Sequence, residues 1–198
     1  MLDIAALSEV CRACKLPLYL DGARLGYGLM SRETDLSLPD IARLCDVFYI
    51  GGTKVGALFG EAVVSKSDTL MRDFRYSIKQ HGGMLAKGRL LGLQFEALFT
   101  DNLYFEIAHH AVTQALRIKA ALQELGVTFL MESHTNQQFP ILPNDIVARL
   151  SNSFLFTPWQ RVSDTHTAIR ICTSWGTTTD NVKALIEALR LNYSQASI

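Results

Sequence analysis

The sequence lacks the long hydrophobic run that a membrane helix requires, because none of its apolar stretches approaches ~20 residues. Its first residues, Met1-Leu2-Asp3-Ile4, carry no basic stretch before an apolar core, so they predict no signal peptide. It also lacks an excess of charge of either sign, with 19 Lys and Arg against 19 Asp and Glu. Proteins that bind nucleic acids or membrane surfaces normally show a basic excess. We therefore expect a soluble, cytoplasmic protein with neither kind of partner.

Cysteine is scarce, with four in the chain. Cys11 and Cys14 form a C-x-x-C pair, which is typical of a redox motif or of half a zinc site. A second such pair is missing, and a structural zinc site needs four suitably placed ligands. The pair also falls inside a helical pattern rather than at a turn before a helix. We interpret both residues as small helix residues of a protein from a reducing compartment, and we predict no metal site.

Two short segments, residues 18–24 (LYLDGAR) and 49–54 (YIGGTK), carry the chemistry that the sequence suggests. Each is an apolar run that ends at small residues and a charged one, which predicts a buried strand of a parallel sheet. Ligands of open α/β sheets bind just past the carboxyl ends of the strands. Asp21 and Lys54 are therefore expected at one sheet edge, where a lysine and a carboxylate suit pyridoxal phosphate (PLP).

A structural ion pair is the alternative interpretation of Asp21 and Lys54, because such pairs are common among charged residues. The neighbouring residues favour the cofactor. Gly51-Gly52-Thr53 precedes the lysine, and Gly22-Ala23 follows the aspartate. Small residues permit the close backbone approach that a flat ring requires.

The hydrophobic pattern predicts an α/β fold in two parts. Residues 1–83 read as part of a large sheet domain, and residues 84–198 as a small α+β domain with long helices. Residues 25–35 are expected to form a loop. Helices are expected at 3–14, 40–44, 67–76, 84–99, 103–125, 143–150 and 181–191. Strands are expected at 18–20, 47–50, 60–65, 127–131, 138–142, 154–156 and 167–173.

Taken together, four motifs resemble those of the low-specificity L-threonine aldolases of the beta-eliminating lyase family, which are fold-type-I PLP enzymes. The motifs are residues 20–24 (LDGAR), 51–56 (GGTKVG), 79–92 (from KQHGG to RLLG) and 169–175 (IRICTSW). The resemblance covers nearly the whole chain, from about residue 3 to 190. It implies the remainder of a fold-type-I large domain followed by the small domain.

The resemblance also implies a role for each site residue. Lys54 would bind the cofactor covalently, and Asp21 would bond the pyridine nitrogen and keep it protonated. Arg24 would lie near that carboxylate and help hold cofactor or substrate, or would only pair with Asp21 structurally. Thr53 would contact phosphate or set the turn. Arg170 would bind the substrate α-carboxylate, which suits a planar bidentate cation, or would be a surface arginine.

The implied reaction is aldol cleavage of L-threonine or L-allo-threonine to glycine and an aldehyde. Two alternatives are another fold-type-I enzyme, an aminotransferase or β-lyase, and an inactive fragment. The substrate would be a small amino acid, and the full-length form would be a homodimer or homotetramer. Family members are much longer, so we expect a C-terminal portion without the phosphate-binding loop and the ring-stacking histidine. Such a chain is expected to bind PLP weakly and to show little activity.

Overall fold

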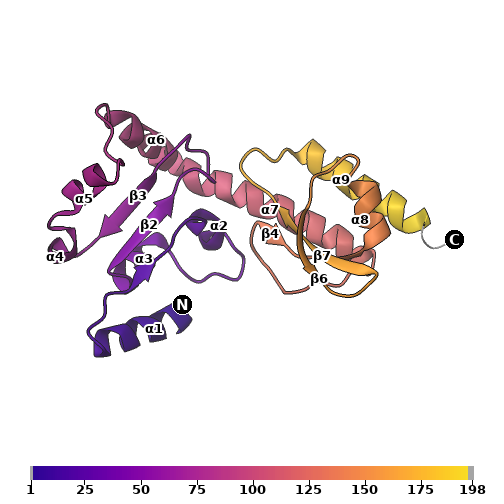
Figure 1. The fold of residues 1–198 in the computed structure, drawn as a ribbon, viewed down its shortest axis with the longest axis horizontal. Coiled ribbons are helices and arrows are strands. Elements are labelled where there is room, and N and C mark those ends of the chain that lie inside the picture. The colour runs from indigo at the N-terminus through magenta and orange to yellow at the C-terminus, as the bar shows by residue number, and fades with distance from the viewer. Residues whose placement is uncertain (1, 196–198) are drawn as a thin grey trace. The chain divides into compact units, whose positions relative to one another are not determined.

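The computed structural model describes residues 2–195, and it consists of two compact units that are described separately (Figure 1). Unit 1 ends at Ile107 and unit 2 begins at Ala108. The division falls inside the long helix α7, Leu103–Glu124.

Unit 1 contains a three-stranded sheet in the order β1-β2-β3. Its strands are β1 Tyr19–Leu20, β2 Val47–Gly51 and β3 Glu61–Ser65. β1 and β2 are parallel, with Leu20 opposite Phe48, as the two apolar segments predict. β3 is antiparallel to β2. Phe48 and Ile50 alternate with partly exposed neighbours and are buried, so β2 anchors the core of this unit.

The remaining elements of unit 1 are helices that lie around this sheet (Figure 1). They are α1 Leu2–Ala13, α2 Leu25–Leu29, α3 Leu38–Leu44, α4 Asp68–Met71, α5 Phe74–Gln80, α6 Arg89–Phe99 and the 3-10 turn Thr100–Asn102. The loop predicted at residues 25–35 is wrong in its first part, because Leu25–Leu29 form the helix α2. Tyr27 and Leu29 are buried there, and their packing overrides the low helix propensity of two glycines. The helix predicted from residue 84 begins only at Arg89.

Unit 1 extends well past residue 84 because α6 packs onto the turn that follows β2. A Cβ at Gly52 would lie 2.8 Å from the Phe95 ring, and one at Gly60 would lie 2.3 Å from Leu91. The compact units of the structure therefore divide later than the domain boundary predicted at 83/84.

Unit 2 is a four-stranded antiparallel sheet packed against helices. Its elements after α7 are β4 Gln137–Gln138, β5 Ile141–Pro143, α8 Asn144–Leu150, β6 Thr157–Arg161, β7 His166–Cys172 and α9 Thr179–Gln195. β7 is central and pairs with each of the other three strands. The core joins Ile118, Leu142, Ile146, Ile169 and Leu189 from both helices and strands.

Two strands predicted in unit 2 are wrong. Residues 127–131 make only an isolated bridge, between Phe129 and Pro140. Residues 154–156 form no strand, and β6 begins at Thr157. Phe154 and Phe156 nevertheless pack against the core of the unit. The apolar pattern of residues 154–156 therefore predicted correctly that they pack against the core. Burial alone, however, does not indicate whether a segment pairs with a neighbouring strand.

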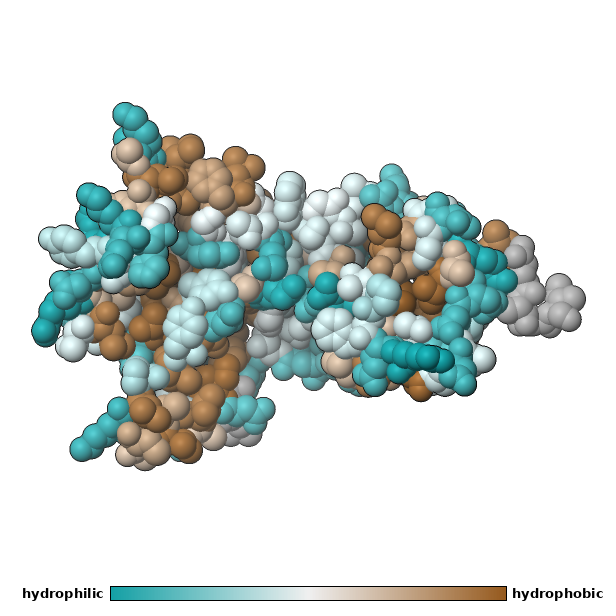
Figure 2. Space-filling model, in the orientation of Figure 1, coloured by the Kyte–Doolittle hydropathy of each residue, from teal (hydrophilic) through white to brown (hydrophobic). Residues whose placement is uncertain are grey.

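Exposed apolar side chains gather on two helices of unit 1. Figure 2 shows hydrophobic surface over α1 and over α6. Leu7 and Val10 of α1, and Leu90 and Leu93 of α6, are each more than two-fifths exposed. Apolar patches are typical of surfaces that contact another polypeptide. No helix within residues 2–195 is long and apolar enough to cross a membrane.

The start of α3 gives a first test. Ser37 and Asp40 form a capping box, in which each side chain accepts a hydrogen bond from the other's backbone N–H. Ser37→Ala should lower the free energy of unfolding by about 1 kcal/mol in urea titrations. Ser77→Ala, on the exposed face of α5, is the control and should have little effect. An equal effect of both substitutions would contradict the capping role.

The capping contribution should also depend on pH. The hydrogen bond from Ser37, followed by that from Arg43, lowers the pKa of Asp40 to about 2. A lowered carboxyl pKa stabilises the fold above the ordinary value of ~3.9, and this contribution is lost as the pH falls toward 2. The stability difference between Ser37→Ala and the natural chain should therefore shrink at acid pH.

Candidate active site

The ends of β1 and β2 are joined by a backbone contact that leaves no room for side chains. The Gly51 N–H donates a hydrogen bond to the Gly22 carbonyl oxygen at 2.9 Å. A Cβ on Gly22 would lie 1.6 Å from the Tyr49 carbonyl oxygen, and one on Gly51 would lie 2.4 Å from that of Ala23. Only glycine fits at either position. The two strand ends, with Asp21 on one and Lys54 just beyond the other, are therefore brought to one sheet edge.

Asp21 presents an exposed carboxylate at this edge. Its Oδ1 accepts hydrogen bonds from the Tyr49 hydroxyl and from the Ala23 N–H, the latter at 3.0 Å. These two bonds, and then the positive charges of Lys54 and Arg24, lower the pKa of Asp21 below its ordinary value. The group is thus an anion at neutral pH. This matches what a partner of a protonated pyridine nitrogen requires.

Lys54 lies in a tight turn directly after β2. The turn is closed by the Val55 N–H, which donates to the Gly52 carbonyl oxygen at 2.9 Å. The Tyr27 hydroxyl holds the Lys54 carbonyl oxygen. The lysine side chain is half-buried, and no residue among 2–195 forms a hydrogen bond or ion pair with its ammonium group. Its nitrogen is therefore available to a ligand, while its backbone is fixed.

Three supporting residues were missed in the sequence. The buried Tyr104 donates to the Gly51 carbonyl oxygen and accepts from the Gly26 N–H, both at 3.1 Å. Burial raises the pKa of Tyr104 to about 12. Glu61 accepts a hydrogen bond from the Gly52 N–H at 2.7 Å, and Tyr49 bonds Asp21. Of the three, Tyr49 alone lies in a segment that the sequence singles out, residues 49–54, and the strand register then places it opposite Asp21.

Arg24 and Thr53 lie next to the two central residues in the chain. Arg24 is exposed at the N-cap of α2, and its charge contributes to the lowered pKa of Asp21. Thr53 is exposed in the turn before Lys54, and no residue of the described chain hydrogen-bonds its side chain. Their cofactor-binding roles remain predictions.

Arg170 lies in unit 2, on β7. Its guanidinium lies 5.4 Å from the centre of the Trp159 ring, a cation–π contact. Its Nε is buried and has no hydrogen-bond partner within residues 2–195. A buried N–H without a partner is costly, and a bound carboxylate would satisfy it.

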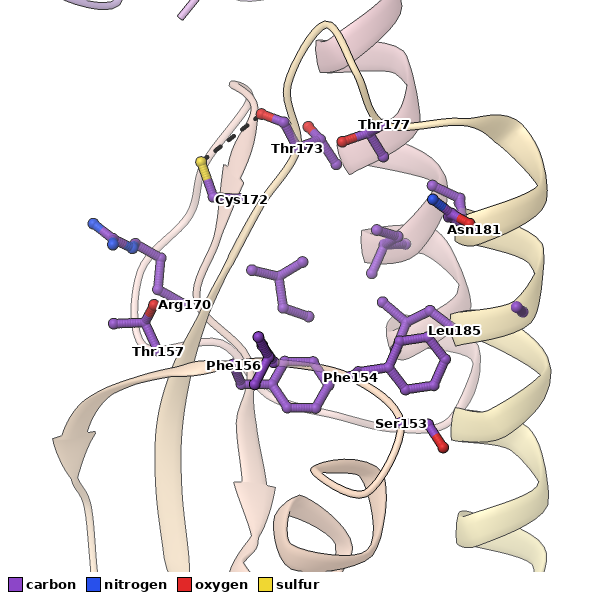
Figure 3. A pocket seen from close by; sticks show the side chains of 15 residues that line it. Ser153, Phe154, Phe156, Thr157, Arg170, Cys172, Thr173, Thr177, Asn181 and Leu185 are labelled. Carbon is purple, nitrogen blue, oxygen red and sulfur yellow. Dashed lines mark hydrogen bonds between the residues drawn. The ribbon is translucent and has the colours of Figure 1, made fainter.

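A cavity of about 580 Å³ lies beside Arg170 in unit 2, between β7, α9 and residues 153–157. Figure 3 shows the Arg170 guanidinium pointing away from the apolar side chains that line this cavity, such as Phe154 and Leu185. The arginine therefore presents its charge on the other side of β7.

The residues of unit 1 fit PLP. Asp21 offers an ionised carboxylate whose Oδ2 receives no hydrogen bond from the described chain. Lys54 offers an ammonium group without a partner among residues 2–195. Glycines at positions 22 and 51 keep the strand ends free of side chains. A flat, cationic ring with an aldehyde needs these three features.

The fold is that of the PLP fold-type-I threonine aldolase structure. The chain belongs to the beta-eliminating lyase family, whose model matches residues 1–144. Members of this family are PLP enzymes. The family and the fold class predicted from the four motifs are confirmed.

Curated relatives agree with this membership. The chain is 27% identical over 194 residues to a low specificity L-threonine aldolase of Pseudomonas aeruginosa, covering 96% of this chain and 54% of the relative. It is 29% identical over 154 residues to one from a Pseudomonas species, covering 77% and 42% respectively. The chain thus spans about half the length of the curated relatives it matches.

Two solved structures show which known folds this chain resembles. A threonine aldolase of Leishmania major matches with a TM-score of 0.92 and 43% identity, over 96% of this chain and 56% of that one. A lysine aminotransferase of M. tuberculosis matches with a TM-score of 0.58 at 15% identity, over 95% and 44%. The second match reflects a shared fold alone.

The glycine contact gives a second test. Gly22→Ala should strongly destabilise unit 1, because its Cβ would overlap the backbone of Tyr49. Gly28→Ala is the matched control, because no atom lies within 4 Å of its Cβ and the residue is helical. The control should be neutral or stabilising by up to about 1 kcal/mol. Urea unfolding measures both, and similar stabilities for the two variants would contradict the close approach of the strand ends.

Proposed function

We propose that this chain carries the lysine and ring-nitrogen site of a PLP-dependent aldolase that acts on β-hydroxy-α-amino acids. The substrates would be L-threonine or L-allo-threonine, and the products glycine and an aldehyde. The observation that carries the proposal is the placement of Asp21 and Lys54 at adjacent strand ends, which the Gly51–Gly22 hydrogen bond holds together. The Pseudomonas and Leishmania relatives, which are named threonine aldolases, support the substrate class.

Each site residue has a defined task in this proposal. Lys54 would bind the cofactor covalently through its side-chain nitrogen. Asp21 would accept a hydrogen bond from the ring nitrogen and keep it protonated. Arg24 would help hold cofactor or substrate, and Thr53 would contact the phosphate. Arg170 binds the substrate α-carboxylate through its planar cation.

The reaction breaks the Cα–Cβ bond of the amino acid. A base removes the proton of the β-hydroxyl group, and the oxygen then becomes the carbonyl of the released aldehyde. Bound PLP supplies an electron sink for the pair of electrons left on Cα. Asp21 maintains the ring charge on which that sink depends. A proton is then added to Cα, and glycine is released.

The chain covers only part of its relatives, and this coverage bears on how tightly it binds PLP and how fast it cleaves threonine. We propose that a polypeptide of residues 1–198 alone binds PLP weakly and cleaves little threonine, because it spans only about half the length of the relatives it matches. The full-length form would act on a small amino acid as a homodimer or homotetramer. Substantial release of glycine and acetaldehyde by the 198-residue chain would contradict the impairment.

Covalent trapping tests the cofactor site even where binding is weak. The chain is incubated with PLP, treated with borohydride to make lysine-bound PLP permanent, and digested for mass spectrometry. We expect the label on Lys54, because its ammonium group has no partner within the described residues and its charge acts on Asp21. Lys54→Ala should lose it. Lys66→Ala removes an exposed lysine that pairs with Asp46, and this control should leave the label intact.

The trapping experiment has a clear contrary outcome. Labels spread evenly over surface lysines, or unchanged labelling of Lys54→Ala, would contradict the proposed cofactor site. A cleavage assay then separates aldolase from aminotransferase chemistry. The aldolase releases glycine and acetaldehyde from threonine, whereas an aminotransferase passes the amino group to an oxo acid.

The carboxylate role of Arg170 can be tested by NMR. Its Nε–H resonance should shift in a saturable manner as glycine or L-threonine is added, because this group is buried without a partner among residues 2–195. Arg161, which is exposed and paired with Asp164, is the internal control and should not shift in this way. Equal responses of both arginines would show nonspecific binding and contradict the assigned role.

A further inference from the structure

The side chain that lies directly across from Asp21 belongs to Tyr49. Parallel pairing of Leu20 with Phe48 brings the next residue of each segment, Asp21 and Tyr49, opposite one another. The Tyr49 hydroxyl donates its hydrogen bond to Oδ1 of Asp21. Tyr49 is held in β2, the central strand of the sheet, so its hydroxyl is a fixed donor rather than a mobile surface group.

The hydrogen bonds to Asp21 are asymmetric. Tyr49 and the Ala23 N–H both donate to Oδ1, and no donor from the described chain reaches Oδ2. An ionised carboxylate has acceptor sites on both oxygens. Two donors on one oxygen fix the rotation of the group and leave the other oxygen to a ligand.

We propose that Tyr49 is a positioning residue of the cofactor site, which holds Oδ1 of Asp21 so that Oδ2 is the oxygen presented to the ring nitrogen. The inference rests on the proposed function for the identity of the ligand. The arrangement of Tyr49 and Asp21 does not depend on it, because both residues belong to unit 1 and contact each other without a cofactor.

The charged and titratable groups around the pair support this role. The hydrogen bond from Tyr49 is the largest cause of the lowered pKa of Asp21, ahead of Ala23, Lys54 and Arg24. The same bond raises the pKa of the Tyr49 phenol to about 12.

Around the Tyr49 phenol, Tyr19 and Glu61 add smaller contributions that also raise its pKa. The Tyr19 ring lies 6.3 Å from that of Tyr49. The hydrogen bond between the two side chains thus keeps the proton on Tyr49 and the negative charge on Asp21. Asp21, the proposed partner of the ring nitrogen, therefore stays ionised.

The test is a carboxyl titration by NMR in the 198-residue chain without cofactor. Tyr49→Phe removes the hydroxyl and keeps the ring, so the Asp21 titration midpoint should rise toward the ordinary value of ~3.9. Tyr19→Phe is the matched control, because it removes a neighbouring hydroxyl that forms no hydrogen bond within residues 2–195. Its Asp21 midpoint should equal that of the natural chain. An unchanged midpoint in Tyr49→Phe would overturn the proposal.

A reciprocal measurement keeps the proposal testable if Tyr49→Phe fails to fold. In the Asp21→Asn variant the negative charge beside Tyr49 is gone, so the phenol of Tyr49 should titrate closer to the ordinary value of ~10. Tyrosine labelled at the ring carbon that bears the hydroxyl resolves Tyr49 from Tyr104, whose high pKa comes from burial. Tyr104 should not move. A Tyr49 midpoint that stays near that of the natural chain would overturn the assigned contact.

A ligand arm tests the presentation of Oδ2. Pyridoxine 5′-phosphate carries the ring nitrogen and lacks the aldehyde, so it cannot bond to Lys54. Tyr49→Phe should bind it more weakly than the natural chain does, and Tyr19→Phe should bind it equally well. Equal binding by the Tyr49 variant would overturn the positioning role. If the natural chain does not label at Lys54 and does not bind this analogue, the proposed function fails, whereas the two titrations still decide the contact between Tyr49 and Asp21.

Discussion

The hydrogen bond from the Gly51 N–H to the Gly22 carbonyl oxygen is the contact on which the candidate site depends. It joins the ends of two parallel strands that are far apart in the sequence, and it is possible only because neither residue carries a side chain. The positions of the carboxylate and the lysine then follow from chain direction alone. Asp21 precedes one glycine, and Lys54 lies in the tight turn that follows the other.

Most of the tertiary support for this contact comes from tyrosines. Tyr104 bonds the Gly51 carbonyl oxygen, Tyr27 bonds that of Lys54, and Tyr49 bonds the Asp21 carboxylate. The rings of Tyr27 and Tyr104 are buried in the core, while their hydroxyl groups reach backbone carbonyl oxygens. These hydrogen bonds hold the backbone and the carboxylate of the site in place, and such support is what orients a ligand.

The sequence was enough to predict that Asp21 and Lys54 lie at the ends of neighbouring strands, but it was less informative about the elements around them. Asp21 and Lys54 were identifiable because an apolar run that ends at glycine and a charged residue indicates a strand end at a ligand-binding edge. Tyr104 was not, since its partner lies more than fifty residues away and an aromatic in a helix usually indicates only packing. The helix at Leu25–Leu29 was missed for a related reason, because burial of Tyr27 outweighs the local preference of glycine.

The strands of unit 2 show the same limit. Phe154 and Phe156 have the apolar spacing of a strand, yet they pack into the core from an irregular segment, and the strand that follows begins at Thr157 with exposed residues. Hydrogen-bonded partners are decided by the path of the whole chain, which a local pattern does not contain.

The apolar face of α1 has a consequence for the behaviour of the molecule in concentrated solution. The charges cancel and the isoelectric point is about 7.0, so near neutral pH little electrostatic repulsion keeps two copies apart. The exposed Leu7 and Val10 can then contact apolar surface on another copy of the chain, because no net charge repels it. Colloidal stability should accordingly be lowest near pH 7 and improve on either side of it.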